Sequence, residues 1–254
     1  MNPSIAVVMP VLNGMPFLTE ALASICAQKY TPLEVIVVDD GSTDGTQDCV
    51  RGFQGIPVRL IECNGLGPAA ARNAGYRASS SELVAFLDAD DLWPSGALQL
   101  LVRALEEQPE AGFAQGLIRN FREPRPGNRQ FVTPPYRFLN LGANLWRRQV
   151  FETVGLLDEE LRLAEDLDIL LRCWEHDIRK AEVLSLVLYY RRHPGGMTHG
   201  LSGAGFGSLK AYKKHIDRIR SGKLNPDLPR HMGLNRYLGT GPLNQDGNLN
   251  AQPR

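Results

Sequence analysis

Three carboxylates, Asp88, Asp90 and Asp91, lie within four positions directly after the apolar run 83–87. Carboxylates this close repel one another unless a cation or a proton shares the site, and hard divalent ions such as Mn²⁺ and Mg²⁺ prefer oxygen ligands. The apolar run is typical of a strand buried on both faces, and ligands of open α/β sheets bind at the carboxyl ends of strands. The stretch therefore favours a metal or ligand site, although a strand that leads into a solvated acidic turn has the same pattern.

Two further stretches carry groups that could act on a substrate. Glu165 and Asp166 open a predicted helix, where acids also compensate the helix dipole, so a capping role and a functional role both remain open. His193 follows Arg191 and Arg192 and precedes a glycine-rich bend. A lone histidine is usually structural, but one beside two arginines can meet a phosphate or a metal.

The residues 65–70 satisfy the GxGxxA pattern of a dinucleotide-binding turn between a predicted strand and a predicted helix. They follow the third predicted strand instead of the first, and the next strand ends in the acidic cluster instead of a single ribose-binding acid. The sequence therefore argues against an NAD site. Gly67 still allows a close approach of the backbone to a ligand, and Arg72 lies about one turn into the helix. A nucleotide diphosphate would suit this corner.

Strands and helices alternate regularly in the first half of the chain. Short apolar runs predict strands at 5–9, 34–38, 58–62 and 83–87. Helices are expected over 13–26, up to about 52, from 67, and over 94–107. Right-handed crossovers make such units a parallel, doubly wound α/β sheet with helices on both faces. Past a Pro/Arg/Gly loop at 122–129 the alternation becomes less regular, with a helix over 147–154, another over 165–174 and a strand over 183–190.

Composition limits the class of protein. The 254 residues are 43% hydrophobic, enough for one large α/β domain or two small ones. Lysine plus arginine equals aspartate plus glutamate, 28 against 28, so no global field draws the chain to nucleic acid. The four cysteines have no metal-ligand or CxxC spacing, which favours a reducing compartment. Without a signal-like or membrane-spanning run, the sequence predicts a soluble cytoplasmic protein.

The last fifty residues carry two separate patterns. Apolar residues recur at three- and four-residue steps over 206–220 with basic residues between them, so a basic amphipathic helix is predicted within 201–222. Packing of this helix on its own domain and peripheral contact with anionic lipid are both open. From 223 to 254 no apolar period remains, and a disordered tail is predicted.

Seven stretches, taken together and in order, resemble the family 2 glycosyltransferases of GT-A fold. They lie at 8–14, 37–44, 71–75, 86–91, 154–159, 165–166 and 192–195, and they include VVDDGSTD and DADD. The resemblance covers about residues 4–200. It implies a Rossmann-like, mixed and mainly parallel sheet, with a nucleotide-sugar-binding half at 1–115 and an acceptor-binding half of the same domain at 116–200.

The resemblance also implies a nucleoside-diphosphate sugar across the carboxyl ends of the strands. Pro10 and Val11 would contact the base or ribose, Asp39 would hydrogen-bond the base unless Asp40 does, and Asp40 could instead cap the turn. The full donor-binding set implied is Pro10, Val11, Asn13, Asp39, Asp40, Gly67, Arg72, Asp88 and Ala89. UDP-sugars are the default donor by resemblance, and a glycan or a lipid-linked molecule is the implied acceptor.

Metal and catalytic roles follow from the same resemblance. Asp90 would bind Mn²⁺ or Mg²⁺ with His193, and with Asp91 as a further candidate. Asp166, beside Glu165, would act as the base that deprotonates an acceptor hydroxyl, so a single displacement would invert the anomeric centre. The implied pathway is polysaccharide, lipopolysaccharide or glycoconjugate synthesis.

Two other classes remain alternatives at this stage. The acidic strand end also resembles that of phosphoaspartyl hydrolases, although those enzymes usually carry the nucleophile on the first strand instead of the fourth. A non-catalytic protein that binds sugar nucleotides or glycans is the other alternative. The presence of both Asp90 and Asp166 argues against it.

Overall fold

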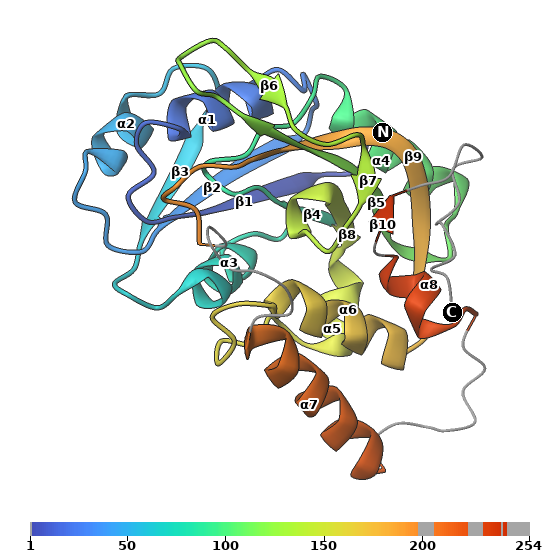
Figure 1. Ribbon diagram of the computed structural model, residues 1–254. Helices are drawn as coiled ribbons and strands as arrows, with labels where there is room; N and C mark the ends of the chain where they lie inside the picture. Colours follow the sequence, from blue (N-terminus) through green and yellow to red (C-terminus); the bar gives the residue numbers. More distant parts are fainter. Residues whose placement is uncertain (1, 198–205, 223–230, 240, 243–254) are drawn as a thin grey trace.

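One mixed sheet runs through the molecule and carries helices on both faces (Figure 1). The computed structural model describes residues 2–197, 206–222, 231–239 and 241–242. The strands of the described part are β1 Ile5–Val11, β2 Leu33–Asp39, β3 Val58–Glu62, β4 Leu83–Phe86, β5 Ala111–Arg122, β6 Gln130–Phe131, β7 Tyr136–Arg137, β8 Asn144–Arg147, β9 Arg179–Arg191 and β10 Gly241–Pro242. The helices are α1 Leu18–Cys26, α2 Thr46–Gly52, α3 Pro68–Arg77, α4 Ala97–Glu107, η1 Leu141–Ala143, α5 Arg148–Val154, α6 Glu165–Glu175, α7 Phe206–Arg220 and α8 Leu234–Leu238.

The first four strands run parallel to one another and form one side of the sheet. The order along the sheet is β10-β7-β5-β8-β4-β1-β2-β3, and β6 and β9 both pair with β5. Strand β1 runs parallel to β2 and to β4, and β2 runs parallel to β3. The predicted βα alternation is therefore confirmed, and the carboxyl ends of β1, β2 and β4 meet at one edge.

Strands β1 and β4 are apolar throughout because both of their faces are covered. In β1, Ile5, Val7 and Met9 join the apolar cluster beneath α1 and α4, while Val8 joins the cluster beneath α3, α5 and α6. Gly75 allows α3 to approach this second face closely, since a Cβ there would lie 2.3 Å from Cγ1 of Val8.

Strand β8 changes the character of the sheet. It lies between β4 and β5 and runs antiparallel to both, which makes the sheet mixed. Strand β9 then runs parallel to β5, and its end brings Arg191 opposite Phe121. The second half of the chain thus completes the sheet started by the first half, and the boundary predicted at 115/116 falls inside β5. The assignment of donor and acceptor roles to the two halves stays a prediction.

The segment 154–166 is attached to α3 by two hydrogen bonds between one side chain of α3 and the backbone of the segment. Asn73 donates to the carbonyl oxygen of Leu157 and accepts from its N–H group, at 2.8 and 3.0 Å. Gly155 ends α5 at φ +84°, a conformation that suits glycine. Two stretches that are far apart in sequence, 71–75 and 154–159, therefore lie in contact.

Helix α7 is present as predicted but its orientation was not foreseen. Within 207–220, Ala211 and His215 are buried, while the apolar side chains of Leu209 and Ile216 are exposed. It packs beside α6, and its later turns extend away from the sheet (Figure 1). None of the helices within the described ranges has the length and apolar character needed to span a bilayer.

The prediction of a disordered tail from 223 onward is wrong for residues 231–239. Tyr237 and Leu238 of α8 are buried, and the carbonyl oxygen of Tyr237 accepts from Nζ of Lys180 at 2.6 Å. Nε1 of Trp174 donates to the carbonyl oxygen of Met232. Sequence periodicity missed this short helix because it has only five residues. The rest of that prediction, at 223–230, 240 and 243–254, lies outside the described residues.

Candidate active site

A cavity of about 840 Å³ opens where the carboxyl ends of the parallel strands meet the loops of the second half. Most of the residues singled out from the sequence line it: Pro10, Val11, Asn13, Asp40, Gly67, Arg72, Asp88, Ala89, Asp90, Glu165, Asp166 and His193. Asp39 and Asp91 are not among the lining residues. The fold therefore brings groups from six separate stretches of the chain into one cavity.

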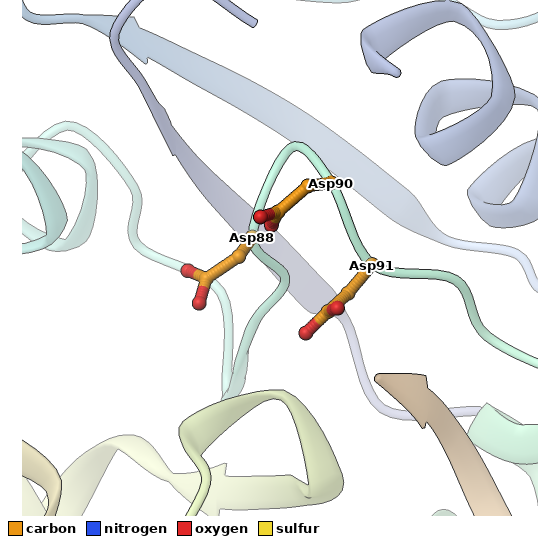
Figure 2. Close-up of side chains that lie close together, drawn as sticks. All are labelled: Asp88, Asp90 and Asp91. Atoms are coloured by element: carbon orange, nitrogen blue, oxygen red, sulfur yellow. The ribbon is translucent and has the colours of Figure 1, made fainter. Parts of the chain in front are cut away.

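The acidic cluster sits on the turn that follows β4. Figure 2 shows the carboxylates of Asp88, Asp90 and Asp91 gathered on this turn. Their ligand oxygens lie within 4.8 Å of one another. Such an oxygen donor set fits Mn²⁺ or Mg²⁺, because a divalent ion would offset the repulsion between like charges.

Asp90 and His193 both line the cavity and contact each other. Nε2 of His193 lies 2.9 Å from Oδ2 of Asp90, although 103 positions separate the two residues. The ring of Phe17 packs on the imidazole with 4.6 Å between centroids. The imidazole is thus fixed beside the carboxylate, which is the placement expected of a second ligand or of a group that faces a diphosphate.

Asp91 differs from its two neighbours because it points into the protein. Its side chain is buried, and Oδ1 accepts from the backbone N–H of Arg191 at 2.8 Å. Burial, and next the charges of Asp90 and Asp88, raise the pKa of Asp91 well above its ordinary value. The structure therefore gives Asp91 a role in fixing the turn, while its part in metal binding stays a prediction.

Arg191 organises this corner and was not singled out from the sequence. Nε donates to the carbonyl oxygen of Asp90 at 2.8 Å, and the other guanidinium nitrogens pair with Glu20 and Glu123. The guanidinium also lies 4.7 Å from the ring centroid of Phe17. The sequence held one signal, the arginine pair before His193, but spacing could not show which arginine turns inward.

Arg72 is buried, and it connects the acidic turn after β4 to α6. Its guanidinium pairs with Asp88 through Nη2 and with Glu165 through Nη1. Burial opposes its charge, but these two carboxylates outweigh that effect and raise the pKa of Arg72 above its ordinary value. Any contact of Arg72 with a nucleotide would therefore compete with two ion pairs already formed.

Asp166 occupies the first turn of α6 and faces the cavity. Ala164 precedes the helix at φ +69°, so the chain turns sharply just before the two acids. Oδ1 of Asp166 accepts from the N–H of Leu167 at 2.7 Å. Burial, and next the charge of Glu165, raise the pKa of Asp166 to about 7. A carboxylate with this pKa can accept a proton near neutral pH.

Asp39 and Asp40 have different partners. Asp39 is fully buried; Oδ1 accepts from Ser42, and Oδ2 accepts from Nε2 of Gln47 at 2.6 Å. Asp40 accepts from the N–H groups of Leu66 and Gly67 at 2.7 and 2.8 Å. Asp40 thus caps the glycine-rich turn. Both N–H groups therefore already have a partner, and the expectation that this corner suits a diphosphate stays a prediction.

Comparison with known proteins identifies the family of the chain. A sequence model described as Glycosyl transferase family 2 matches residues 6–155, which is more than half of the chain. The chain belongs to glycosyl transferase family 2. It is also similar to the uncharacterized glycosyltransferase EpsJ of Bacillus subtilis, with 27% identity over 220 residues. That match covers 78% of this chain and 64% of EpsJ, so the chain spans less than two thirds of that relative.

Solved structures share the fold. One is Staphylococcus aureus TarS 1–349 in complex with UDP-GlcNAc, with a TM-score of 0.69 and 22% identity over 89% of this chain and 68% of TarS. Another is the mannosyltransferase PcManGT of Pyrobaculum calidifontis in complex with GDP-Man and Mn²⁺, with a TM-score of 0.62 and 22% identity over 89% and 67% of the two chains. At this identity the likeness confirms the GT-A type architecture.

Family membership bears on two of the earlier alternatives. It argues against an NAD site at 65–70 and against a phosphoaspartyl nucleophile at 88–91. The structure supplies a physical reason for each. The N–H groups of the first pattern bind Asp40, and Asp88 of the second is paired with Arg72.

Proposed function

We propose that this chain transfers a sugar from a nucleoside-diphosphate sugar, by default a UDP-sugar, to a hydroxyl of a glycan or lipid-linked acceptor with inversion of the anomeric centre. The observation that carries the proposal is that Asp90 and Asp166, on separate elements, line the same cavity. One can serve the leaving group while the other serves the nucleophile. Polysaccharide, lipopolysaccharide or glycoconjugate synthesis is the proposed pathway class.

The donor is proposed to bind along the ends of β1 and β4. Pro10 and Val11 offer an apolar wall for the base or ribose, and Asp88 and Ala89 line the cavity beside them. Asn13 is held by the turn at 42–43, since its N–H donates to Ser42 and its Oδ1 accepts from Thr43. Donor complexes of TarS and PcManGT support a nucleotide sugar as the substrate class.

Mn²⁺ or Mg²⁺ would be held by Asp90 and His193, with the remaining acids of the turn nearby. When bound, the ion supplies positive charge that neutralises the leaving diphosphate without proton transfer. Arg191 keeps Asp90 in place by donating to the carbonyl oxygen of Asp90. The ring of Phe17 packs on the ring of His193 and keeps it in place. The Mn²⁺ in PcManGT and the oxygen-rich turn support a divalent ion.

Asp166 is the proposed base. An acceptor hydroxyl is a weak nucleophile at neutral pH, and a carboxylate with a pKa of about 7 can remove its proton in the transition state. Glu165 is a poor candidate because its Oε1 already accepts from Arg72. Attack from the side of Asp166 on a donor held on the Asp90 side would invert the configuration.

The proposal is tested with radiolabelled nucleotide sugars, Mn²⁺ and either water or a mixed glycan pool as acceptor. Wild-type protein should hydrolyse or transfer one of the donors, and Asp166→Asn should retain donor binding but lose turnover. Asp48→Asn, at an exposed acid of α2, is the matched control. Donor binding without hydrolysis or transfer in every condition would favour the non-catalytic binder instead.

A cytoplasmic location is part of the proposal. All four cysteines, Cys26, Cys49, Cys63 and Cys173, are free thiols in the structure. Free thiols of this kind agree with a reducing compartment. Nucleotide sugars that are made in the cytoplasm would then be accessible to the cavity.

A further inference from the structure

Helix α7 exposes a continuous apolar stripe. Leu209, Tyr212, Ile216 and Ile219 follow one another at steps of three and four residues, so they share one helix face. Their exposed fractions are 62%, 39%, 44% and 48%. Helices of globular proteins normally turn such a face toward the core. In this protein the stripe is left on the surface of the described structure.

The opposite face of α7 holds the helix to the domain through charged groups. Nζ of Lys214 lies 2.7 Å from Glu160, and Nε of Arg218 lies 2.7 Å from Glu175, which is fully buried. Lys214 also pairs with Asp158. The polar side of the helix is thus the attached side, and the apolar stripe is not needed to keep α7 in place.

Two cations flank the stripe. Lys213 and Arg220 are four residues after Leu209 and Ile216, so they lie next to the stripe on the exposed side. Neither forms an ion pair with any residue that the structure describes. An apolar stripe with adjacent exposed cations is the composition of a helix that lies in the headgroup region of an anionic bilayer.

The beginning of α7 reaches the candidate active site. Gly207 and Ser208 line the cavity. A Cβ at Gly207 would lie 2.8 Å from the carbonyl oxygen of Leu163, so the helix start is pressed against the segment just before Asp166. A surface that contacts the stripe would therefore lie beside the rim of the cavity on the side of the proposed base.

We propose that α7 docks the enzyme on an anionic lipid surface and presents the cavity to an acceptor carried by that membrane. The stripe 209–219 would enter the headgroup region, with Lys213 and Arg220 on lipid phosphates. The acceptor part of this inference rests on the proposed transferase function. The docking part stands on α7 alone, so the two can fail separately.

Vesicle sedimentation of the full chain tests docking. Vesicles of phosphatidylcholine with about one third phosphatidylglycerol should bind the wild type, and pure phosphatidylcholine should bind it much less. Lys213→Gln/Arg220→Gln should weaken binding on the order of 30-fold, since each cation near an anionic surface contributes about fivefold. Ile216→Gln/Ile219→Gln should weaken it at least tenfold, because two apolar side chains no longer enter the interface.

Matched controls use exposed residues elsewhere. Leu184→Gln removes an apolar side chain of β9 that is 58% exposed, and Arg51→Gln/Arg103→Gln removes two exposed cations. Both should bind vesicles like the wild type. Equal binding of the stripe variants and the controls would overturn the docking proposal. So would concentration-dependent dimerisation, measured by sedimentation velocity, that the stripe variants abolish, because a second copy would then cover the stripe.

The depth of the two ends of α7 in the membrane tests whether the cavity faces a membrane-borne acceptor. Leu209→Trp and Ile219→Trp should both be quenched by brominated lipid beyond the wild-type background, because a helix lying in the plane brings both ends to the same depth. Quenching at position 219 alone would place the cavity away from the lipid and overturn a membrane-borne acceptor. Hydrolysis of a UDP-sugar in solution should stay within about twofold in all stripe variants. If the wild type binds vesicles but does not hydrolyse a UDP-sugar, the transferase function is rejected instead.

Discussion

Arg72 donates from Nη1 to Oε1 of Glu165 at 2.7 Å, and the same guanidinium binds Asp88. Arg72 belongs to α3 and Glu165 begins α6, so one buried cation ties α3 and the acidic turn to the helix that carries Asp166. A buried charge without its partner costs several kcal/mol. The geometry of the site therefore depends on this ion pair as much as on the lining residues.

The first prediction concerns this pair. Arg72→Met should lower the free energy of unfolding by about 3–5 kcal/mol, because Glu165 would keep a buried charge without a cation. Arg51→Met is the control; its ion pair with Glu62 is exposed, and such pairs contribute about 0–1 kcal/mol. The double variant Arg72→Met/Glu165→Met should recover part of the loss in chemical denaturation. Additive losses would show that the two residues are not energetically coupled.

Asp166 should separate binding from chemistry. Asp166→Asn keeps the side-chain shape but cannot accept a proton, so turnover should fall about 10²–10⁴-fold while UDP and Mn²⁺ binding persist. Glu165→Gln should cost much less, because the amide oxygen can still accept from Arg72. If Glu165→Gln is inactive and Asp166→Asn is active, Glu165 is the base and the assignment to Asp166 is wrong.

The raised pKa of Asp166 also makes a prediction about pH. Turnover of the wild type should fall as the pH drops through about 7, because the base becomes protonated. The ionised carboxylate is disfavoured in the folded protein. The free energy of unfolding therefore falls as the pH rises from the ordinary pKa of the carboxyl, near 4, to about 7. Asp166→Asn should therefore raise Tm at pH 8 and have little effect at pH 4. A lower Tm of this variant at pH 8 would contradict the burial of a charged group.

Metal binding gives a prediction at the acidic turn. Asp90→Asn should reduce the stabilisation that UDP gives in the presence of Mn²⁺, measured as a rise in Tm. In the wild type, UDP at a hundred times its dissociation constant should add roughly 2.7 kcal/mol of stability. His193→Ala should act in the same direction more weakly, and Asp48→Asn should change nothing. If the UDP effect with Mn²⁺ is the same in Asp90→Asn as in the wild type, the assignment of the metal ligand fails.

A last prediction tests the correction at the C-terminal part of the chain. Tyr237→Ala should cost about 3–5 kcal/mol of stability, because a fully buried ring is removed together with the hydrogen bond of its hydroxyl to Ile178. Arg236→Ala, on the exposed side of the same helix, should cost little. Equal unfolding midpoints for the two variants in urea would show that α8 does not contribute to the folded domain.

The positions of the elements in the first half followed from the sequence. The apolar run 5–9 lies within β1, and the acids after 83–87 are at a strand end, because both faces of a covered parallel strand must be apolar and helices must begin with turn residues. The same local chemistry placed Glu165 at the start of a helix. Family resemblance then pointed to the residues that line the cavity, since its stretches lie at strand ends and helix starts.

The partners of those residues were decided by the tertiary structure alone. No pattern in the sequence shows that Asp91 turns inward to the N–H of Arg191, that the turn capped by Asp40 is the one before α3, or that α7 is attached by its charged face. Each of these depends on contacts between residues 26 to 100 positions apart or on which face of a helix meets a neighbour. Periodicity determines that a helix has two faces, but only packing determines which face is buried.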